Sequence, residues 1–210
     1  PVQYAYDSQG RKTNMTTWQG YPSSGAATTV WQFDAYRGFM TNKIYDGGAN
    51  GPAYTNDAAG RPTQRTWARG TNTTYTYNDA GDLLTATYSD PGTPSITNTY
   101  DRRGRVTTIK QGTNSTSRLY DDAGNLLSEK YTAGILSGLT VSNVFDNLLR
   151  RTNNGLWNGS AWLTQTRYTY DAASRLLAVS DGTNSATYTY LTNSPLVSTI
   201  QFTNDGTLRM

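Results

Sequence analysis

The sequence predicts an all-β protein of consecutive antiparallel β-hairpins that form one long curved or spiralling sheet. Three observations support this prediction. A phrase with an aromatic residue, an aspartate and, three residues later, a glycine recurs along the 210 residues. Tyrosine and threonine alternate in stretches such as "TYTY" (74–77), and a side-chain period of two is typical of strands. Apolar residues at helical spacing do not persist beyond a turn, and Gly, Asn or Pro interrupts every window of about ten residues.

The repeat is aligned on the residue that precedes the acidic position of each phrase. That residue is Tyr6, Phe33, Asn56, Tyr77, Tyr100, Tyr120, Phe145, Tyr170 and, in a degenerate copy, Tyr190. Successive copies are 20 to 27 residues apart, which fits units of two strands and two turns. We therefore expect residues 1–210 to form a single array of about eight to nine units, excised from a longer protein.

Each phrase contains the residues of a tight hairpin turn. An aspartate at the first position of a type I turn accepts backbone N–H groups further on, and the glycine fits the left-handed position of the adjoining bulge. Asn78 provides the same side-chain acceptor in its copy. The predicted signature, a structural element and not a pocket, comprises Tyr6, Asp7, Gly10, Phe33, Asp34, Asp57, Gly60, Tyr77, Asn78, Gly81, Tyr100, Asp101, Gly104, Tyr120, Asp121, Gly124, Phe145, Asp146, Tyr170 and Asp171.

A second family of turns alternates with the first. "RGTNTTY" from Arg69, "QGTNSTS" from Gln111 and "DGTNSAT" from Asp181 place Gly-Thr-Asn between extended runs. One repeat then has strands at 175–180 and 185–190. Tyrosines two residues apart share a face, so we expect their rings to pair with rings on neighbouring strands.

Longer loops are predicted at 19–29, 46–53 and 89–95, which are rich in Gly, Pro and Ser. "LWNGSAWL" predicts a tight Asn-Gly hairpin between Trp157 and Trp162. No internal domain boundary is expected.

Composition excludes several classes of protein. The apolar fraction of 35% is below the ~45–50% of ordinary soluble domains. The net charge is +3, and the arginines are scattered at turn ends, where we expect them to be solvated and not to bind nucleic acid. No apolar run reaches the ~20 residues of a membrane helix, so no membrane insertion is expected.

The sequence has few of the residue types that catalysis and metal binding require. The chain has no histidine and no cysteine, which removes the usual general base, thiolate chemistry and the commonest metal ligand. Asp121 and Asp122 are adjacent on a turn and point apart, unlike the carboxylate pair of a glycosidase. "YDGGANG" (45–51) offers a calcium ion only the carboxylate of Asp46. We predict no enzyme, no cofactor, and no catalytic or metal site.

The repeated phrase, together with "YRGFMTNKIYDGG" (36–48), resembles the RHS or YD-repeat proteins, which include shells of bacterial polymorphic toxins, the C component of insecticidal toxin complexes and teneurins. The resemblance covers essentially the whole chain. It implies a strip of sheet that forms part of a β-shell around an effector. Family toxins often end the shell with a self-cleaving Asp-Pro-x-Gly-Leu element, whereas Asp90-Pro91-Gly92 lacks the leucine and is expected to be a plain turn.

These observations predict a structural, non-catalytic wall segment of a secreted or surface bacterial RHS-repeat protein that encapsulates or presents a toxin or effector. Its partners would be other parts of the same shell, or further copies of itself through open sheet edges. The alternative is a carbohydrate-binding or adhesive repeat module that uses exposed tyrosine and tryptophan rings. Its tryptophan candidates are Trp18, Trp31, Trp67, Trp157 and Trp162.

Overall fold

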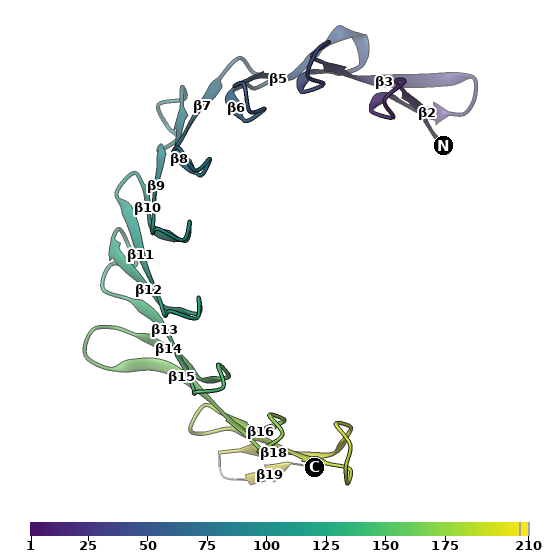
Figure 1. The fold of residues 1–210 in the computed structure, drawn as a ribbon. Coiled ribbons are helices and arrows are strands. Elements are labelled where there is room, and N and C mark those ends of the chain that lie inside the picture. The colour runs from purple at the N-terminus through teal and green to yellow at the C-terminus, as the bar shows by residue number, and fades with distance from the viewer. Residues whose placement is uncertain (206, 210) are drawn as a thin grey trace. The chain divides into compact units, whose positions relative to one another are not determined.

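The computed structural model describes residues 1–205 and 207–209, and it confirms the all-β prediction. The described residues form nineteen strands and one short 3-10 helix, in two compact units, Pro1–Asn98 and Thr99–Met210 (Figure 1). The division falls inside strand β9 (Ile96–Tyr100). A single array without an internal boundary therefore stays a prediction.

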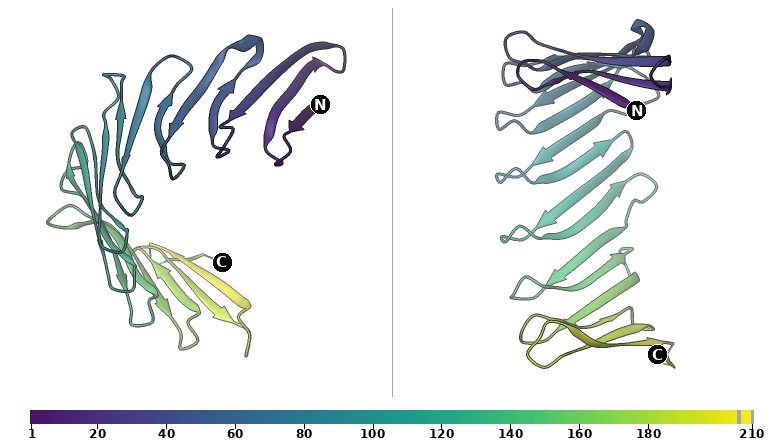
Figure 2. Two further views of the ribbon diagram at one scale, coloured as in Figure 1. Left: turned by 45° about the horizontal axis from the view of Figure 1, so that its top comes forward. Right: turned by 90° about the vertical axis from the view of Figure 1, so that its right-hand side faces the viewer.

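The elements of the first unit are β1 (Val2–Tyr6), β2 (Lys12–Gly20), β3 (Ser24–Phe33), β4 (Met40–Ile44), the 3-10 helix η1 (Asp46–Gly48), β5 (Asn50–Asn56), β6 (Pro62–Thr66), β7 (Asn72–Tyr77) and β8 (Leu83–Tyr88). Those of the second unit are β10 (Val106–Gln111), β11 (Asn114–Tyr120), β12 (Leu126–Ala133), β13 (Thr140–Phe145), β14 (Arg151–Trp157), β15 (Trp162–Tyr170), β16 (Leu176–Ser180), β17 (Ser185–Tyr190), β18 (Val197–Asn204) and β19 (Thr207–Arg209). Within each unit, every strand pairs antiparallel with its neighbours in sequence (Figure 2).

Two of the three predicted loops need correction. β2 continues to Gly20 and β3 begins at Ser24, so most of 19–29 is strand, because Ala27 and Thr28 pair with Thr17 and Thr16. Residues 46–53 contain η1 and the start of β5 instead of one loop. The loop at 89–95 is confirmed, as is the hairpin in which Trp157 pairs with Trp162.

The two faces of the sheet differ in composition. Tyr75 and Tyr77 of β7 are half-buried on one face, and Tyr75 pairs with Ala86. Thr74 and Thr76 are exposed on the other face, where Thr76 and Thr85 share a hydroxyl hydrogen bond of 2.7 Å. We call these the tyrosine face (Tyr75, Tyr77, Ala86 and the positions in register with them) and the threonine face (Thr74, Thr76, Thr85, Thr87 and the positions in register with them).

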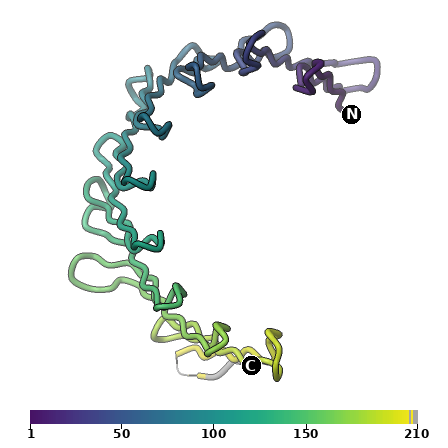
Figure 3. The backbone as a smooth tube through the Cα atoms, viewed as in Figure 1, coloured from purple at the N-terminus to yellow at the C-terminus, as the bar shows by residue number. Residues whose placement is uncertain are grey.

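Neither unit has a conventional core. Among the described residues only Gly51, Pro52, Thr73, Ala86 and Gly155 are buried, and the large apolar side chains are all at least partly exposed. An ordinary domain packs two layers around one apolar core. Here a single layer must be held by its hydrogen-bond ladder and by whatever covers the tyrosine face. Arginines of the turns that follow β5 and β13 lie against rings on that face, and Figure 3 draws the turns as small hooks along the trace.

Candidate functional site: the repeated aspartate turn

The turn after β5 shows how the repeated phrase folds. Oδ1 of Asp57 accepts the backbone N–H groups of Ala59 and Arg61, both at 2.9 Å. The Asp57 carbonyl accepts the Gly60 N–H at 3.1 Å, and the Asp57 N–H donates to the Arg61 carbonyl at 2.9 Å. Gly60 has a φ of 83°, a left-handed conformation that glycine adopts without strain. One carboxylate and one glycine therefore reverse the chain within five residues.

In both units, the Asp or Asn side chain that opens a turn accepts a hydrogen bond from the backbone N–H of the residue four positions later. Its acceptors are Asp7, Asp57, Asn78, Asp101, Asp121, Asp146 and Asp171. The left-handed slot is filled by Gly10, Gly60, Gly81, Gly104 and Gly124, and by Leu149 and Ser174 with φ values of 60° and 63°.

Asp34 departs from this pattern. Its turn is one residue longer, because its N–H donates to the Phe39 carbonyl at 2.7 Å and its carbonyl accepts the Gly38 N–H at 3.0 Å. Its Oδ1 caps Tyr36 and Arg37 at 3.0 and 2.6 Å. Phe39 then occupies the place that an arginine fills in other turns, and its ring lies against Gly60 of the following turn.

Five of the arginines at the turn ends are ion-paired and only partly exposed, which corrects the prediction from sequence that they are solvated. In five turns the guanidinium binds the aspartate four residues earlier at 2.6–2.7 Å, with 22–36% of the arginine side chain exposed. The five pairs are Arg11–Asp7, Arg61–Asp57, Arg105–Asp101, Arg150–Asp146 and Arg175–Asp171. The sequence contains a signal for these ion pairs, because all five copies place an arginine at the fourth position after the aspartate.

Each such arginine also reaches the aromatic residue of the next turn. The Arg61 guanidinium lies 4.7 Å from the centre of the Tyr77 ring, and the Tyr77 hydroxyl donates to the Pro62 carbonyl at 2.8 Å. Arg150 and Tyr170 repeat both contacts, at 4.7 and 2.8 Å, the latter to the carbonyl of Arg151. The remaining examples of the stacking are Arg11 on Phe33, Arg105 on Tyr120 and Arg175 on Tyr190. A cation over an aromatic face contributes roughly 0.5–2 kcal/mol.

This arrangement replaces the predicted pairing of tyrosine rings across strands. Five of the in-phase rings carry a guanidinium on one face, which leaves no room there for another ring. Ring–ring contacts join Tyr4 with Tyr6 instead. The tryptophans of the glycan alternative are also engaged: Trp18 packs edge-on against Tyr21, and Trp157 packs edge-on against Trp162.

Two turns use an amide in place of the guanidinium. The Asn78 side-chain amide donates to the carboxylate of Asp82 at 2.9 Å, and Asn125 donates to Asp121 at the same distance. In both cases one carboxylate and one carboxamide bridge the turn. These turns without the arginine therefore keep a side-chain bridge within the turn. The residue at the arginine position, Asp82 or Asn125, has no guanidinium to stack on the aromatic residue of the next turn.

Hydrogen bonding holds the turn carboxylates in their charged form. The backbone N–H of Arg61 lowers the pKa of Asp57, against partial desolvation, and the Arg61 guanidinium lowers it further. The backbone N–H of Arg175 does the same to the pKa of Asp171. In Asp146 the side chain of Arg150 is the largest cause of the lowered pKa.

These lowered pKa values predict acid sensitivity. A depressed folded-state pKa adds stability above the unfolded value of about 3.9, and this stability is lost as pH falls through the lower folded values. We expect the urea midpoint to be nearly constant from about pH 5 to 7 and to fall steadily below about pH 4. Urea titrations followed by circular dichroism at each pH measure this. A midpoint that rises on acidification would contradict the paired state of the turn aspartates.

In the candidate calcium loop, the carboxylate of Asp46 already accepts a hydrogen bond from the protein backbone. Oδ1 of Asp46 accepts the backbone N–H of Thr28 at 2.9 Å. Over residues 1–205 and 207–209 no three Asp, Glu, His or Cys side chains gather as metal ligands would.

Comparison with known proteins finds similar solved structures but no match to a family model or a curated protein. Among solved structures, the chain is similar to TcdB2-TccC3-Cdc42 at 15% identity and a TM-score of 0.63, over 98% of this chain and 14% of that one. It is similar to the Photorhabdus luminescens Tc holotoxin pore with a TccC3 mutation at 12% identity and a TM-score of 0.60, over 97% and 13%.

These likenesses define the class: a β-hairpin repeat protein with the fold of part of the TcdB2-TccC3 structures. The resemblance to RHS and YD-repeat shells is confirmed at the level of the fold. The chain spans only 13–14% of the length of the structures it matches. No helix in the described part of the chain is long and apolar enough to cross a membrane.

Proposed function

We propose that the chain is a non-catalytic wall segment of a β-shell in a secreted or surface bacterial protein. The observation that carries this proposal is the link between successive hairpins, in which the arginine of one turn stacks on the aromatic residue of the next. The similarity to TcdB2-TccC3, over nearly all of this chain and about a seventh of those chains, supports it. A segment of that relative size is one part of a wall, and the array of eight to nine units in residues 1–210 would act as that part.

The mechanism of such a wall is mechanical. Backbone groups of neighbouring strands are paired, so a protease finds few exposed extended segments to bind. The turn aspartates and glycines of the predicted signature, together with the arginines paired to those aspartates, keep the single layer rigid without a core. Guanidinium groups cover rings of the tyrosine face, and the threonine face offers hydroxyl groups such as those of Thr76 and Thr85 to any molecule that lies against it. Other parts of the same shell, or further copies, would continue the ladder from its edge strands.

Electron microscopy and protease protection of the full-length gene product test this role. We expect closed, hollow particles in which the sequence following the repeats survives trypsin until the shell is opened by denaturant. An open ribbon, with the following sequence cleaved at the rate of a free peptide, would overturn the wall function.

A further inference from the structure

Three asparagines of the chain are followed directly by glycine: Asn50, Asn154 and Asn158. Asparagine deamidates most readily before glycine, because no Cβ hinders attack by the next backbone nitrogen on the side-chain carboxamide. That nitrogen and the carboxamide carbon close a five-membered succinimide ring. The structure places the three asparagines in two different settings, and the settings predict different reactivity.

Two of the pairs lie inside strands. Asn50 and Gly51 begin β5, and Asn154 and Gly155 lie in the middle of β14. Gly51 and Gly155 are both buried, and Gly155 pairs with Gln165 on the neighbouring strand. Ring closure requires the backbone at the asparagine to rotate out of the extended conformation. The hydrogen-bond ladder opposes that rotation, because the strand would have to leave its partner.

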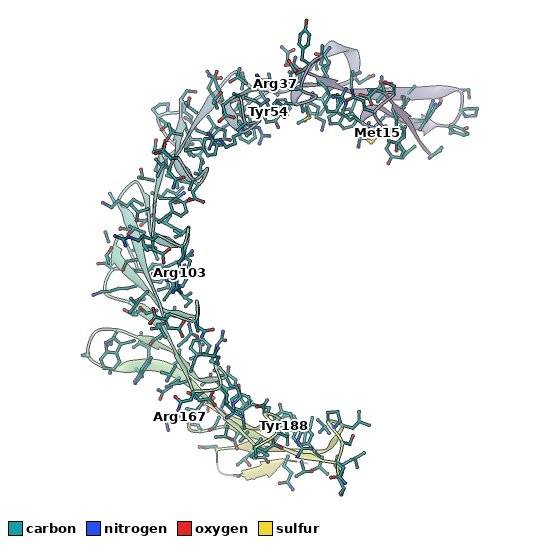
Figure 4. The ribbon with its side chains drawn as sticks, viewed as in Figure 1. Met15, Arg37, Tyr54, Arg103, Arg167 and Tyr188 are labelled. Carbon is teal, nitrogen blue, oxygen red and sulfur yellow. The ribbon has the colours of Figure 1, made fainter. Side chains whose placement is uncertain are left out.

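The third pair lies in a turn. Asn158 and Gly159 join β14 to β15, and both residues are exposed. Figure 4 draws this hairpin, on which Arg167 is labelled, with its loop projecting from the ribbon. No group of the described chain accepts a hydrogen bond from the Gly159 N–H. No ladder therefore holds the nitrogen that must attack.

Three donors surround the carboxamide oxygen of Asn158. Its Oδ1 accepts the backbone N–H groups of Ser160 and Ala161 at 3.0 and 2.8 Å, and the Ser160 hydroxyl at 3.0 Å. Negative charge develops on this oxygen when a nitrogen adds to the carboxamide carbon, and donors that are already oriented stabilise such charge. The turn therefore favours addition at the carbon that these bonds polarise.

A second turn of the same form already contains the acid that deamidation would produce. The Asp181 N–H donates to the Asn184 carbonyl at 3.1 Å, and Oδ1 of Asp181 accepts the N–H groups of Thr183 and Asn184 at 2.9 and 2.6 Å. The backbone N–H of Asn184 is the largest cause of the lowered pKa of Asp181. Gly182 and Gly159 have φ values of 98° and 96°. An aspartate at position 158 therefore fits its turn as an anion.

We propose that Asn158 is a site of spontaneous deamidation, promoted by the donors on its Oδ1, and that Asn50 and Asn154 are stable in the folded chain. Hydroxide takes the proton of the Gly159 N–H, and this nitrogen forms a bond to the carboxamide carbon. The bond from that carbon to the carboxamide nitrogen breaks, and the nitrogen takes a proton from water and leaves as ammonia, which regenerates hydroxide. Water then opens the succinimide to aspartate or isoaspartate. The reaction adds one negative charge and is independent of the wall function.

Peptide mapping by mass spectrometry after incubation of the folded protein at about pH 8 tests the proposal. Chymotrypsin cleaves after Trp157 and so separates Asn154 from Asn158. We expect the mass gain of an amide-to-acid exchange at Asn158, about tenfold or more faster than at Asn50 and Asn154. A protein isoaspartate methyltransferase should label the same peptide. In urea, where the strands are lost, the three sites should react at similar rates.

Ser160→Ala removes one of the three donors and leaves the backbone N–H groups in place. We expect it to slow the reaction about two- to tenfold, as for the loss of one hydrogen bond. Ser137→Ala, at an exposed turn position of the same unit, should leave the rate unchanged. No mass gain at Asn158, an equal rate at Asn50 or Asn154 in the folded protein, or an unchanged rate in Ser160→Ala would each overturn the proposal.

Discussion

Gly60→Ala is expected to lower the free energy of unfolding by about 2–5 kcal/mol. Two effects add. A non-glycine residue in the left-handed conformation costs roughly 1–2 kcal/mol, and Gly60 has a φ of 83°. A Cβ at this position would also lie 2.6 Å from the Phe39 ring, which fills the space of an arginine in the neighbouring turn. The ring would have to move, and overpacking of this kind costs about 1–3 kcal/mol.

Gly10→Ala is the matched control. Gly10 occupies the same slot with a φ of 79°, but no atom lies within 4 Å of its would-be Cβ. It should show the backbone cost alone, about 1–2 kcal/mol. Urea unfolding of both variants measures the difference. Equal losses would show that the contact between Phe39 and Gly60 does not restrict this turn.

Arg175→Ala is the second large effect, with an expected loss of about 1–3 kcal/mol. The side chain joins three groups: the Asp171 carboxylate at 2.6 Å, the Ser194 carbonyl at 2.7 Å and the Tyr190 ring, whose centre is 4.5 Å away. Its removal leaves Asp171 without its charged partner and uncovers the Tyr190 ring. Arg175→Lys retains the charge but loses the planar donor fork, so an intermediate loss is expected.

Arg102→Ala makes the same chemical change at an exposed turn position. Its effect should stay within about 0.5 kcal/mol, as for ordinary surface substitutions. Thermal unfolding of Arg175→Ala, Arg175→Lys and Arg102→Ala measures the loss of stability in each variant, and we expect the losses to decrease in that order. If Arg102→Ala cost as much as Arg175→Ala, general charge loss and not the three contacts would explain the result.

The strands and turns could be predicted because their causes are local. An aspartate that caps the N–H two and four residues later, and a glycine between them, need no distant partner. Strand 185–190 coincides with β17 for the same reason, since Gly-Thr-Asn precedes it and "TYTY" fixes its period. The stretch 19–29 was misread because its glycines and serines suggest a loop, whereas pairing with β2 keeps Ala27 and Thr28 extended.

The contacts between hairpins could not be predicted in this way. Arg61 and Tyr77 are sixteen residues apart, and their approach depends on the register of β6, β7 and β8. The approach of Lys12 to the Trp31 ring depends in turn on the register shift that puts Lys12 opposite Tyr6. A shift of one residue would send a side chain to the other face. The regular recurrence of arginine was visible in the sequence, but its stacking partner was not.

A double-mutant cycle on Arg150 and Tyr170 tests most directly whether hairpins are held together by these contacts. Arg150→Ala, Tyr170→Leu and the combined variant are compared by urea unfolding. A guanidinium 4.7 Å from the ring centre predicts a coupling energy of about 0.5–2 kcal/mol. If the losses in the free energy of unfolding are strictly additive, the Arg150–Tyr170 contact does not stabilise the protein. Contacts of this kind would then not hold neighbouring hairpins of the single-layer sheet together.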